Sequence, residues 1–289
     1  MRRRDFIAAL GGAAAASWPV AVRAQPADDR VRALLFRILS LEAEGAAATI
    51  GQFLKEMESQ IGWTTQLPWS VGTIEQRRFD ARGLLRQVPA ITEIDMLDAT
   101  GKEQLRISRL AADEVGRNEV GRDTDFSQDP KFTEALAHKV YYGPVYLRRQ
   151  SEPYMILSLA GTRREAGVSS AEVGLKLVWD LIQHPRVSEH TVAYVLDAQD
   201  RIIGHSDMFN AQAQAVDHVD LGLFQRDLSG LAQVQAARAA GPSATTQAHV
   251  ARDINGRDVL AVSASVAVPG LGWHVFVELP VAEADTAVP

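Results

Sequence analysis

The stretch that decides the fold is residues 94–108, which read I-D-M-L-D-A-T-G-K-E-Q-L-R-I-S. Residues 192–206 repeat the pattern as V-A-Y-V-L-D-A-Q-D-R-I-I-G-H-S, with the shared Leu-Asp-Ala 99 residues further along. In each copy an apolar strand runs into an Asp-Ala turn, and a second strand leaves it. Aspartate suits such turns because its side chain bonds the following backbone, and glycine accepts positive φ. Two copies of one motif predict two small units in tandem.

More strands are expected after each copy of the motif. These strands cover residues 141–149, 153–160, 172–181, 259–268 and 273–279. The dipeptide Asn255-Gly256 is a strong signal for a tight hairpin turn. The helices expected between the strands cover residues 74–87, 130–139 and 231–239. The chain is therefore predicted to be an α+β protein with antiparallel sheets.

A long helix is expected before both units. Apolar residues recur at helical spacing from Val31 to Ile61, which predicts one amphipathic helix over residues 28–60. At 1.5 Å per residue this helix would be roughly 50 Å long, which exceeds one small domain. It should therefore run beside both units. Its apolar residues are spread too widely for one small domain to cover, which predicts a homodimer through this helix.

The composition excludes several classes of protein. The chain has 289 residues, a formal net charge of −6 and no cysteine. The acidic balance argues against non-specific nucleic-acid binding, for which a basic face is the usual feature. Without cysteine there can be no disulfide, no thiolate metal site and no lipoprotein anchor.

The N-terminus is typical of an export signal. Residues 1–7 are basic, residues 8–22 are weakly apolar, and small residues precede a cleavage point between Ala24 and Gln25. Arg3-Arg4-x-Phe6-Ile7 resembles a twin-arginine signal, and a general secretory signal is the alternative. The sequence shows no segment that should span a membrane. Residues 1–24 are therefore predicted to be removed, and the mature protein to be periplasmic.

No catalytic motif is present, so we expect neither an enzyme nor a cofactor. The letters of a catalytic triad occur in His205-Ser206-Asp207, but adjacent residues in one strand cannot all converge on a substrate. A metal site is conceivable at Asp217-His218-x-Asp220, although a solvated polar loop explains these residues better. The seven histidines share no metal-ligand spacing.

A cluster of tyrosines and basic residues is the strongest candidate site. Strand alternation places Tyr142, Tyr146 and Arg148 on one sheet face, with Tyr154 and Lys176 nearby. Phenols donate hydrogen bonds, and arginine can grip a carboxylate with two parallel bonds. These residues therefore predict a pocket for a small anion. The alternative is that they are exposed residues on a half-buried sheet.

Several phrases together resemble the double Cache sensor family of extracytoplasmic ligand-binding regions. They are D-F-S-Q-D-P-K-F at 125–132, Y-G-P-V-Y at 142–146, E-P-Y-M at 152–155, A-E-V-G-L-K at 171–176, V-L-D-A at 195–198 and G-L-G-W-H-V-F-V-E at 270–278. Their order and spacing extend over about residues 28–284. The resemblance implies a long N-terminal helix that carries two PAS-like units, with the ligand in the first, membrane-distal one.

The resemblance suggests a division of the chain and a function. The expected parts are the export signal 1–24, the helix and linker 25–70, a ligand-binding membrane-distal unit 71–187 and a membrane-proximal unit 188–289. Amino-acid-binding members place an aspartate for the ligand ammonium where this chain has Lys176, and their Arg-x-Trp-Tyr phrase is missing, so an anion is favoured over an amine. The prediction is a periplasmic sensor of a small carboxylate that informs a membrane-bound signalling partner. The alternatives are the detached input region of a histidine kinase or chemoreceptor, and a periplasmic hydrolase with an unrecognised site.

Overall fold

The computed structural model describes residues 25–66, 71–109, 124–148, 152–183, 188, 190–208, 221–241 and 249–286. The predicted export signal and the Asp217-His218-x-Asp220 motif lie outside these residues, as does most of the expected junction at 185–189. The domain boundaries and the cleavage of the signal remain predictions.

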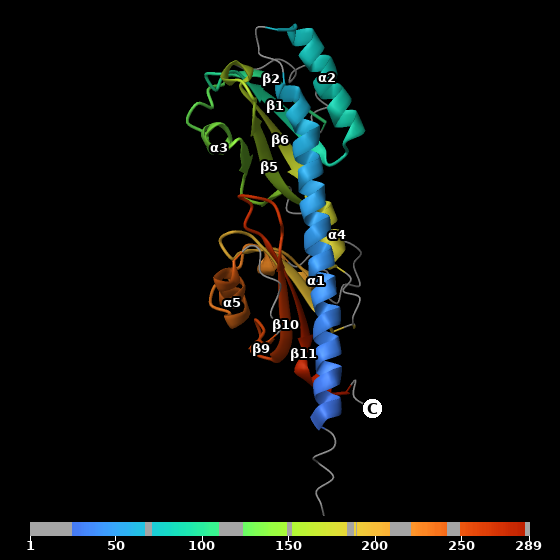
Figure 1. Cartoon of the computed structure of the whole chain (residues 1–289). Coiled ribbons are helices and arrows are strands. Elements are labelled where there is room, and N and C mark those ends of the chain that lie inside the picture. Colours follow the sequence, from blue (N-terminus) through green and yellow to red (C-terminus); the bar gives the residue numbers. More distant parts are fainter. Residues whose placement is uncertain are drawn as a thin grey trace, which may run out of the picture.

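Helix α1 spans Gln25–Gly62 and runs beside both units (Figure 1). Its buried stripe includes Leu39, Ile50, Leu54 and Ile61, each fully inaccessible to solvent. The stripe packs against both sheets, since α1 contacts strands β5 and β6 of the first and β10 and β11 of the second. The expectation of one helix that supports two units is confirmed.

The first unit is a six-stranded antiparallel sheet with helices on both faces. Its elements are α2 (Ile74–Gln87), β1 (Ile91–Leu97), β2 (Glu103–Ser108), α3 (Pro130–His138), β3 (Val140–Tyr142), β4 (Tyr146–Arg148), β5 (Glu152–Ala160) and β6 (Val168–Gly174). The strand order is β2-β1-β6-β5-β3, and β4 also pairs with β5. Helices α1 and α2 cover the inner face, and α3 lies on the outer face (Figure 1).

The second unit repeats this topology. Its elements are β7 (Val192–Leu196), β8 (Ile202–His205), α5 (Ala232–Ala240), β9 (His249–Arg252), β10 (Asp258–Ser265), β11 (His274–Pro280) and α6 (Val281–Thr286), and α4 (Lys176–Ile182) joins the two units. Its strand order, β8-β7-β11-β10-β9, corresponds to β2-β1-β6-β5-β3. The tandem repeat predicted from the sequence is therefore present as two copies of one sheet.

The repeated Asp-Ala turns have the same hydrogen bonds in both units. Asp98 Oδ1 accepts the backbone N–H groups of Thr100 at 2.8 Å and Lys102 at 3.2 Å. Asp197 Oδ1 accepts those of the residues two and four positions later, at 2.8 and 2.9 Å. The aspartate thus satisfies backbone donors that the turn leaves outside the sheet.

The expected strand over 172–181 is wrong in its second half. Strand β6 ends at Gly174, and helix α4 follows at once. Leu175, Val178 and Ile182 are buried at helical spacing. Their neighbours also alternate in polarity, so this short apolar run fits both a helix and a strand, and periodicity alone could not separate them.

The expected strand over 141–149 is also interrupted. Tyr142 of β3 opposes Leu157, whereas Tyr146 of β4 opposes Tyr154. Four residues on one side therefore match three on the partner strand, as in a β-bulge. One extra residue reverses the alternation, so Tyr142 and Tyr146 point to opposite faces of the sheet.

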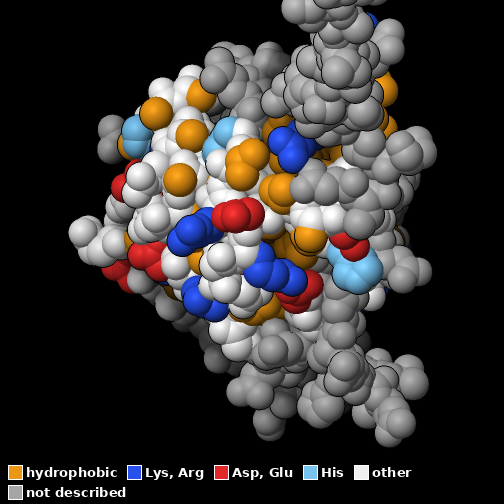
Figure 2. Space-filling model, turned by 90° about the horizontal axis from the view of Figure 1, so that it is seen from below, with side chains coloured by type: hydrophobic (Ala, Val, Ile, Leu, Met, Phe, Trp, Pro, Cys, Tyr) orange, Lys and Arg blue, Asp and Glu red, His pale blue; other side chains and the backbone are white. Residues whose placement is uncertain are grey.

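The start of α1 and helix α6 lie at the same end of the molecule (Figure 1). Viewed from that end, acidic and basic side chains are interspersed with apolar ones over the coloured surface (Figure 2). Among the described residues, α1 included, no helix is both long and apolar enough to cross a membrane.

Candidate ligand-binding site

The candidate site lies on the outer face of the first sheet, which is the face opposite α1. Alternation along β1 turns Ile94 and Met96 into the core beneath α1 and α2. Glu93 and Asp95 therefore point to the outer face. Charged residues at alternate positions of a largely apolar strand make this face the candidate site.

A polar row crosses the sheet through four strands in register. Arg106 on β2 opposes Asp95 on β1, which opposes Ser170 on β6, which opposes Ser158 on β5. The two serines are buried, and the hydroxyl of Ser158 donates to that of Ser170 at 2.8 Å. Buried polar groups need hydrogen-bond partners, and the two serines supply them to each other.

Two cations neutralise the carboxylates of β1. Arg106 Nη2 donates to Glu93 Oε1 at 2.5 Å, and its Nε lies 3.6 Å from Asp95 Oδ1. Lys131 Nζ donates to Asp95 Oδ2 at 2.9 Å and lies 3.5 Å from the centre of the Phe126 ring. Burial, followed by the charge of Asp95, raises the pKa of Glu93 above its ordinary value.

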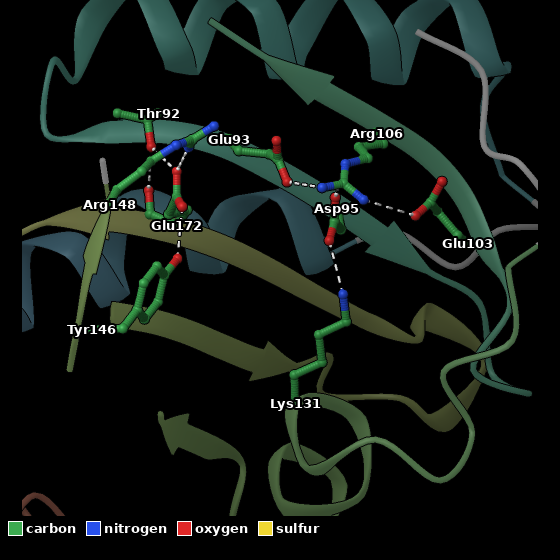
Figure 3. Close-up of polar contacts among 9 residues, drawn as sticks. All are labelled: Thr92, Glu93, Asp95, Glu103, Arg106, Lys131, Tyr146, Arg148 and Glu172. Atoms are coloured by element: carbon green, nitrogen blue, oxygen red, sulfur yellow. Dashed lines mark hydrogen bonds and ion pairs between the residues drawn. The ribbon is translucent and has the colours of Figure 1, made fainter. Parts of the chain in front are cut away.

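Glu172 on β6 is held by three donors, an arrangement that we call the Glu172 clamp (Figure 3). Tyr146 Oη donates to its Oε1 at 2.6 Å, and Thr92 Oγ1 donates to its Oε2 at 2.5 Å. The guanidinium of Arg148 donates to the same Oε2. Burial, with the bond to Glu172, raises the pKa of Tyr146, so the phenol stays a donor. Three donors of this part of the face thus bind one carboxylate, that of Glu172.

Charges of both signs are paired on the outer face, with three cations against four carboxylates among the described residues. Three cations, Arg106, Lys131 and Arg148, each lie within ion-pair distance of at least one carboxylate. The carboxylates in these pairs are Glu93, Asp95, Glu103 and Glu172. The expectation of a locally cationic pocket is therefore wrong for the described residues, because protein carboxylates already occupy its cations.

The structure separates the five residues predicted to line the site. Tyr146 and Arg148 share the Glu172 clamp. Tyr154 lies beside them: its ring centre is 6.4 Å from that of Tyr146, and its hydroxyl donates to Glu152 at 2.7 Å. Burial is the main cause that raises the pKa of Tyr154 to about 12.

Tyr142 and Lys176 do not belong to this group. The hydroxyl of Tyr142 donates to Glu58 of α1, on the inner face of the sheet. Lys176 lies on α4 rather than on a strand, and its side chain is 75% exposed and pairs with Asp180 at 3.0 Å. Placing them in the pocket was wrong, because the bulge after β3 turns Tyr142 to the inner face and because β6 is followed by a helix that carries Lys176.

Sequence reasoning missed most of the polar network. The missed residues are Thr92, Glu93, Asp95, Glu103, Arg106, Lys131 and Glu172. The signal available for three of them was a carboxylate inside an otherwise apolar strand. Such a residue is costly to bury unless it is paired, so it indicates a partner elsewhere in the fold.

The second sheet has an equivalent position that is filled differently. Val192 opposes Glu278 in the second sheet, as Glu93 opposes Glu172 in the first. Tyr194 Oη donates to Glu278 Oε1 at 2.6 Å, and its ring stacks on that of Phe276, with centres 5.0 Å apart. This face is packed with buried apolar and aromatic side chains around Tyr194.

His205 takes part in this packing. Its ring stacks on Tyr194 with centres 5.4 Å apart, and its Nδ1 accepts the backbone N–H of Asp207 at 3.1 Å. Burial lowers the pKa of His205. The histidine of the His205-Ser206-Asp207 phrase is thus a core residue. Within the described ranges, no three histidine, aspartate or glutamate side chains gather as a metal site.

Solved structures of sensory domains share this fold. The sensory domain of the Campylobacter jejuni chemoreceptor Tlp3 is 12% identical, and the match covers 90% of this chain and 99% of that one, with a TM-score of 0.65. The ligand-binding domain of the Pseudomonas aeruginosa PAO1 chemoreceptor PctC, in complex with GABA, is 15% identical, with 86% and 99% covered and a TM-score of 0.58. The extracellular domain of soHK1S-Z6, assigned as a histidine kinase, is 16% identical, with 92% and 99% covered and a TM-score of 0.58. No family model and no curated protein matches the sequence.

Proposed function

We propose that this chain is an exported sensory domain that binds a small carboxylate-bearing molecule on the outer face of its first sheet. The observation that carries the proposal is the Glu172 clamp. Hydroxyl and guanidinium donors from Thr92, Tyr146 and Arg148 already converge there on one carboxylate. Charge-assisted bonds of this kind are the strong ones in proteins.

The similar structures support the ligand class. Tlp3 domains have been solved with L-valine, L-norvaline and isoleucine, and the PctC domain with GABA. Each of these molecules carries a carboxylate and an amine. The charges of both signs on the outer face suit such a ligand, because Arg148 can bind its carboxylate while the acidic side chains accept its ammonium group.

A screen of ligands against matched variants tests this function. Thermal unfolding of the chain from Gln25 should shift upward with small carboxylates or amino acids, since a ligand that binds only the native state stabilises it. Arg148→Met should abolish the shift. Lys176→Met removes an exposed lysine paired with Asp180 and should leave the shift unchanged. Equal responses of wild type and Arg148→Met would refute the site.

The signalling partner would be membrane-bound. A second copy of the chain would pack against the N-terminal part of α1. Leu34, Ile38 and Leu41 are 61%, 48% and 61% exposed on α1. Their four- and three-residue spacing is the apolar repeat of a two-helix seam. We propose that two copies pack through this stripe.

A further inference from the structure

The carboxylate of Glu172 occupies the donors that a ligand carboxylate needs. We propose that Glu172 is an internal competitor, which holds Arg148 and Tyr146 until a ligand displaces it and which thereby sets the ligand specificity of the site. This inference rests on the proposed function, because it names the residue that regulates the same site.

Both carboxylate oxygens of Glu172 accept hydrogen bonds, as those of a bound ligand carboxylate would. Oε1 accepts from Tyr146 at 2.6 Å, and Oε2 accepts from Thr92 at 2.5 Å and from Arg148. Thr92 lies on β1, which pairs with β6 on one side. Tyr146 and Arg148 lie on β4, which pairs with β5 on the other side of β6. No single strand supplies this arrangement, and the carboxylate at its centre holds the strands together.

Exposure decides which member of the pair a ligand meets first. The side chain of Arg148 is 30% exposed, whereas that of Glu172 is 9% exposed. An incoming carboxylate therefore reaches the guanidinium from solvent and competes with Glu172 for it. The two carboxylates cannot both keep the same donors.

Displacement leaves the carboxylate of Glu172 in unfavourable surroundings unless the ligand brings a positive charge to it. Glu93 lies directly opposite Glu172 across β1 and β6, and like charges in facing positions repel. A ligand that also carries an ammonium group can compensate the released carboxylate. A carboxylate without an amine cannot do so. Glu172 should therefore favour amino acids over simple carboxylates.

Three related compounds and one matched pair of variants test this inference. The probes are L-valine, 3-methylbutanoate, which lacks its ammonium group, and isobutylamine, which lacks its carboxylate. Glu172→Gln removes the competing charge, and its affinity for 3-methylbutanoate should rise about tenfold or more over wild type. Glu278→Gln makes the same change at the equivalent position of the second sheet and should leave all three affinities unchanged.

The gain must depend on Arg148. In calorimetric titrations, the double variant Glu172→Gln with Arg148→Met should lose the gain for 3-methylbutanoate. Isobutylamine should gain nothing from Glu172→Gln, and the preference for L-valine over 3-methylbutanoate should shrink. Circular dichroism checks that each variant is folded. If Glu172→Gln does not fold, Glu172→Asp replaces it in the test. Aspartate draws the carboxylate back by one methylene, so a smaller gain in affinity for 3-methylbutanoate is expected.

Two outcomes overturn the inference. One is that Glu172→Gln has no higher affinity for 3-methylbutanoate than wild type, whether both proteins bind it equally or neither binds it. The other is a gain that survives Arg148→Met. If Arg148→Met abolishes ligand responses while Glu172→Gln produces no gain, only the competitor role fails. If neither variant changes any response, the proposed function fails with it.

Discussion

Glu278→Gln should stabilise the protein at neutral pH. Glu278 is 2% exposed, and its Oε1 accepts from Tyr194 at 2.6 Å and from Gln233 at 2.8 Å. Burial is the main cause that raises its pKa above the ordinary value of 4.5, and these two hydrogen bonds oppose the rise. The buried carboxylate is therefore harder to ionise in the folded chain than in the unfolded one.

The size of the effect follows from the groups around Glu278. Glutamine keeps an acceptor for Tyr194 and Gln233 and removes the charge. Burial of a charged group costs more than the about 1–3 kcal/mol of a neutral unpaired one. The bonds from Tyr194 and Gln233 offset part of this cost, so removal of the charge should raise the free energy of unfolding by about 1–2 kcal/mol at pH 7.

The sign of the pH dependence is fixed by the direction of the pKa shift. Because the folded state holds the proton more tightly, wild-type stability falls as pH rises from the unfolded pKa to the folded pKa. Below the unfolded value both states are protonated, and this contribution vanishes. The advantage of Glu278→Gln over wild type should therefore be largest at neutral pH, should shrink as the pH falls through the folded pKa toward about 4.5, and should be lost below that value.

Urea unfolding at pH 7 and pH 4 measures this difference. The control is Asp258→Asn, which removes an exposed carboxylate paired with Arg252 at 3.5 Å and should change little at either pH. If Glu278→Gln lowers the free energy of unfolding at pH 7, the two donors stabilise the carboxylate more than burial penalises it. A gain of equal size at both pH values would show that charge is not its cause.

Two further predictions concern packing and assembly. Gly167→Ala should lower the free energy of unfolding by about 3 kcal/mol or more, because Gly167 has φ +71° and an added Cβ would lie 1.9 Å from the carbonyl oxygen of Leu97. Gly45→Ala should instead raise the free energy of unfolding by roughly 0.5–1 kcal/mol, because an added Cβ would meet nothing within 4 Å. Denaturant titration of the two variants compares these effects. Leu34→Gln combined with Leu41→Gln should make the mature chain monomeric in sedimentation, and a wild type that is already monomeric at high concentration would contradict the proposed seam.

The sequence predicted correctly those helices whose ends are marked by nearby capping or helix-breaking residues. Helix α2 was expected over 74–87 and spans those residues, because Thr73 caps its start and Val88-Pro89 ends it. Thr73 Oγ1 accepts the N–H of Gln76 at 3.2 Å, which satisfies a donor of the first turn. The residues after Gly174 carry no such signal, and there a helix was taken for a strand.

The site was harder to predict because its contacts join distant residues. Thr92 and Glu172 are 80 positions apart, and their bond depends on the pairing of β1 with β6. Tyr146 and Arg148 were found because they lie two apart on one short strand. Alternation failed for Tyr142 because the bulge that turns it inward is set by the pairing of β3 and β4 with β5.

The Glu172 clamp also lies where a change in the first unit can reach the second. Strand β4 carries Arg148 and follows Val145, whose carbonyl accepts from Gln225 Nε2 of the second unit at 3.1 Å. Strand β6 carries Glu172 and leads into α4, where Trp179 Nε1 donates to the carbonyl of Ile203 at 2.8 Å. Glu172 and Arg148 thus join the two segments that both contact the second unit. We infer that a ligand that draws Glu172 away from Arg148 and Tyr146 would break the side-chain bonds between β4 and β6, and that the second unit would respond to the ligand through these two segments.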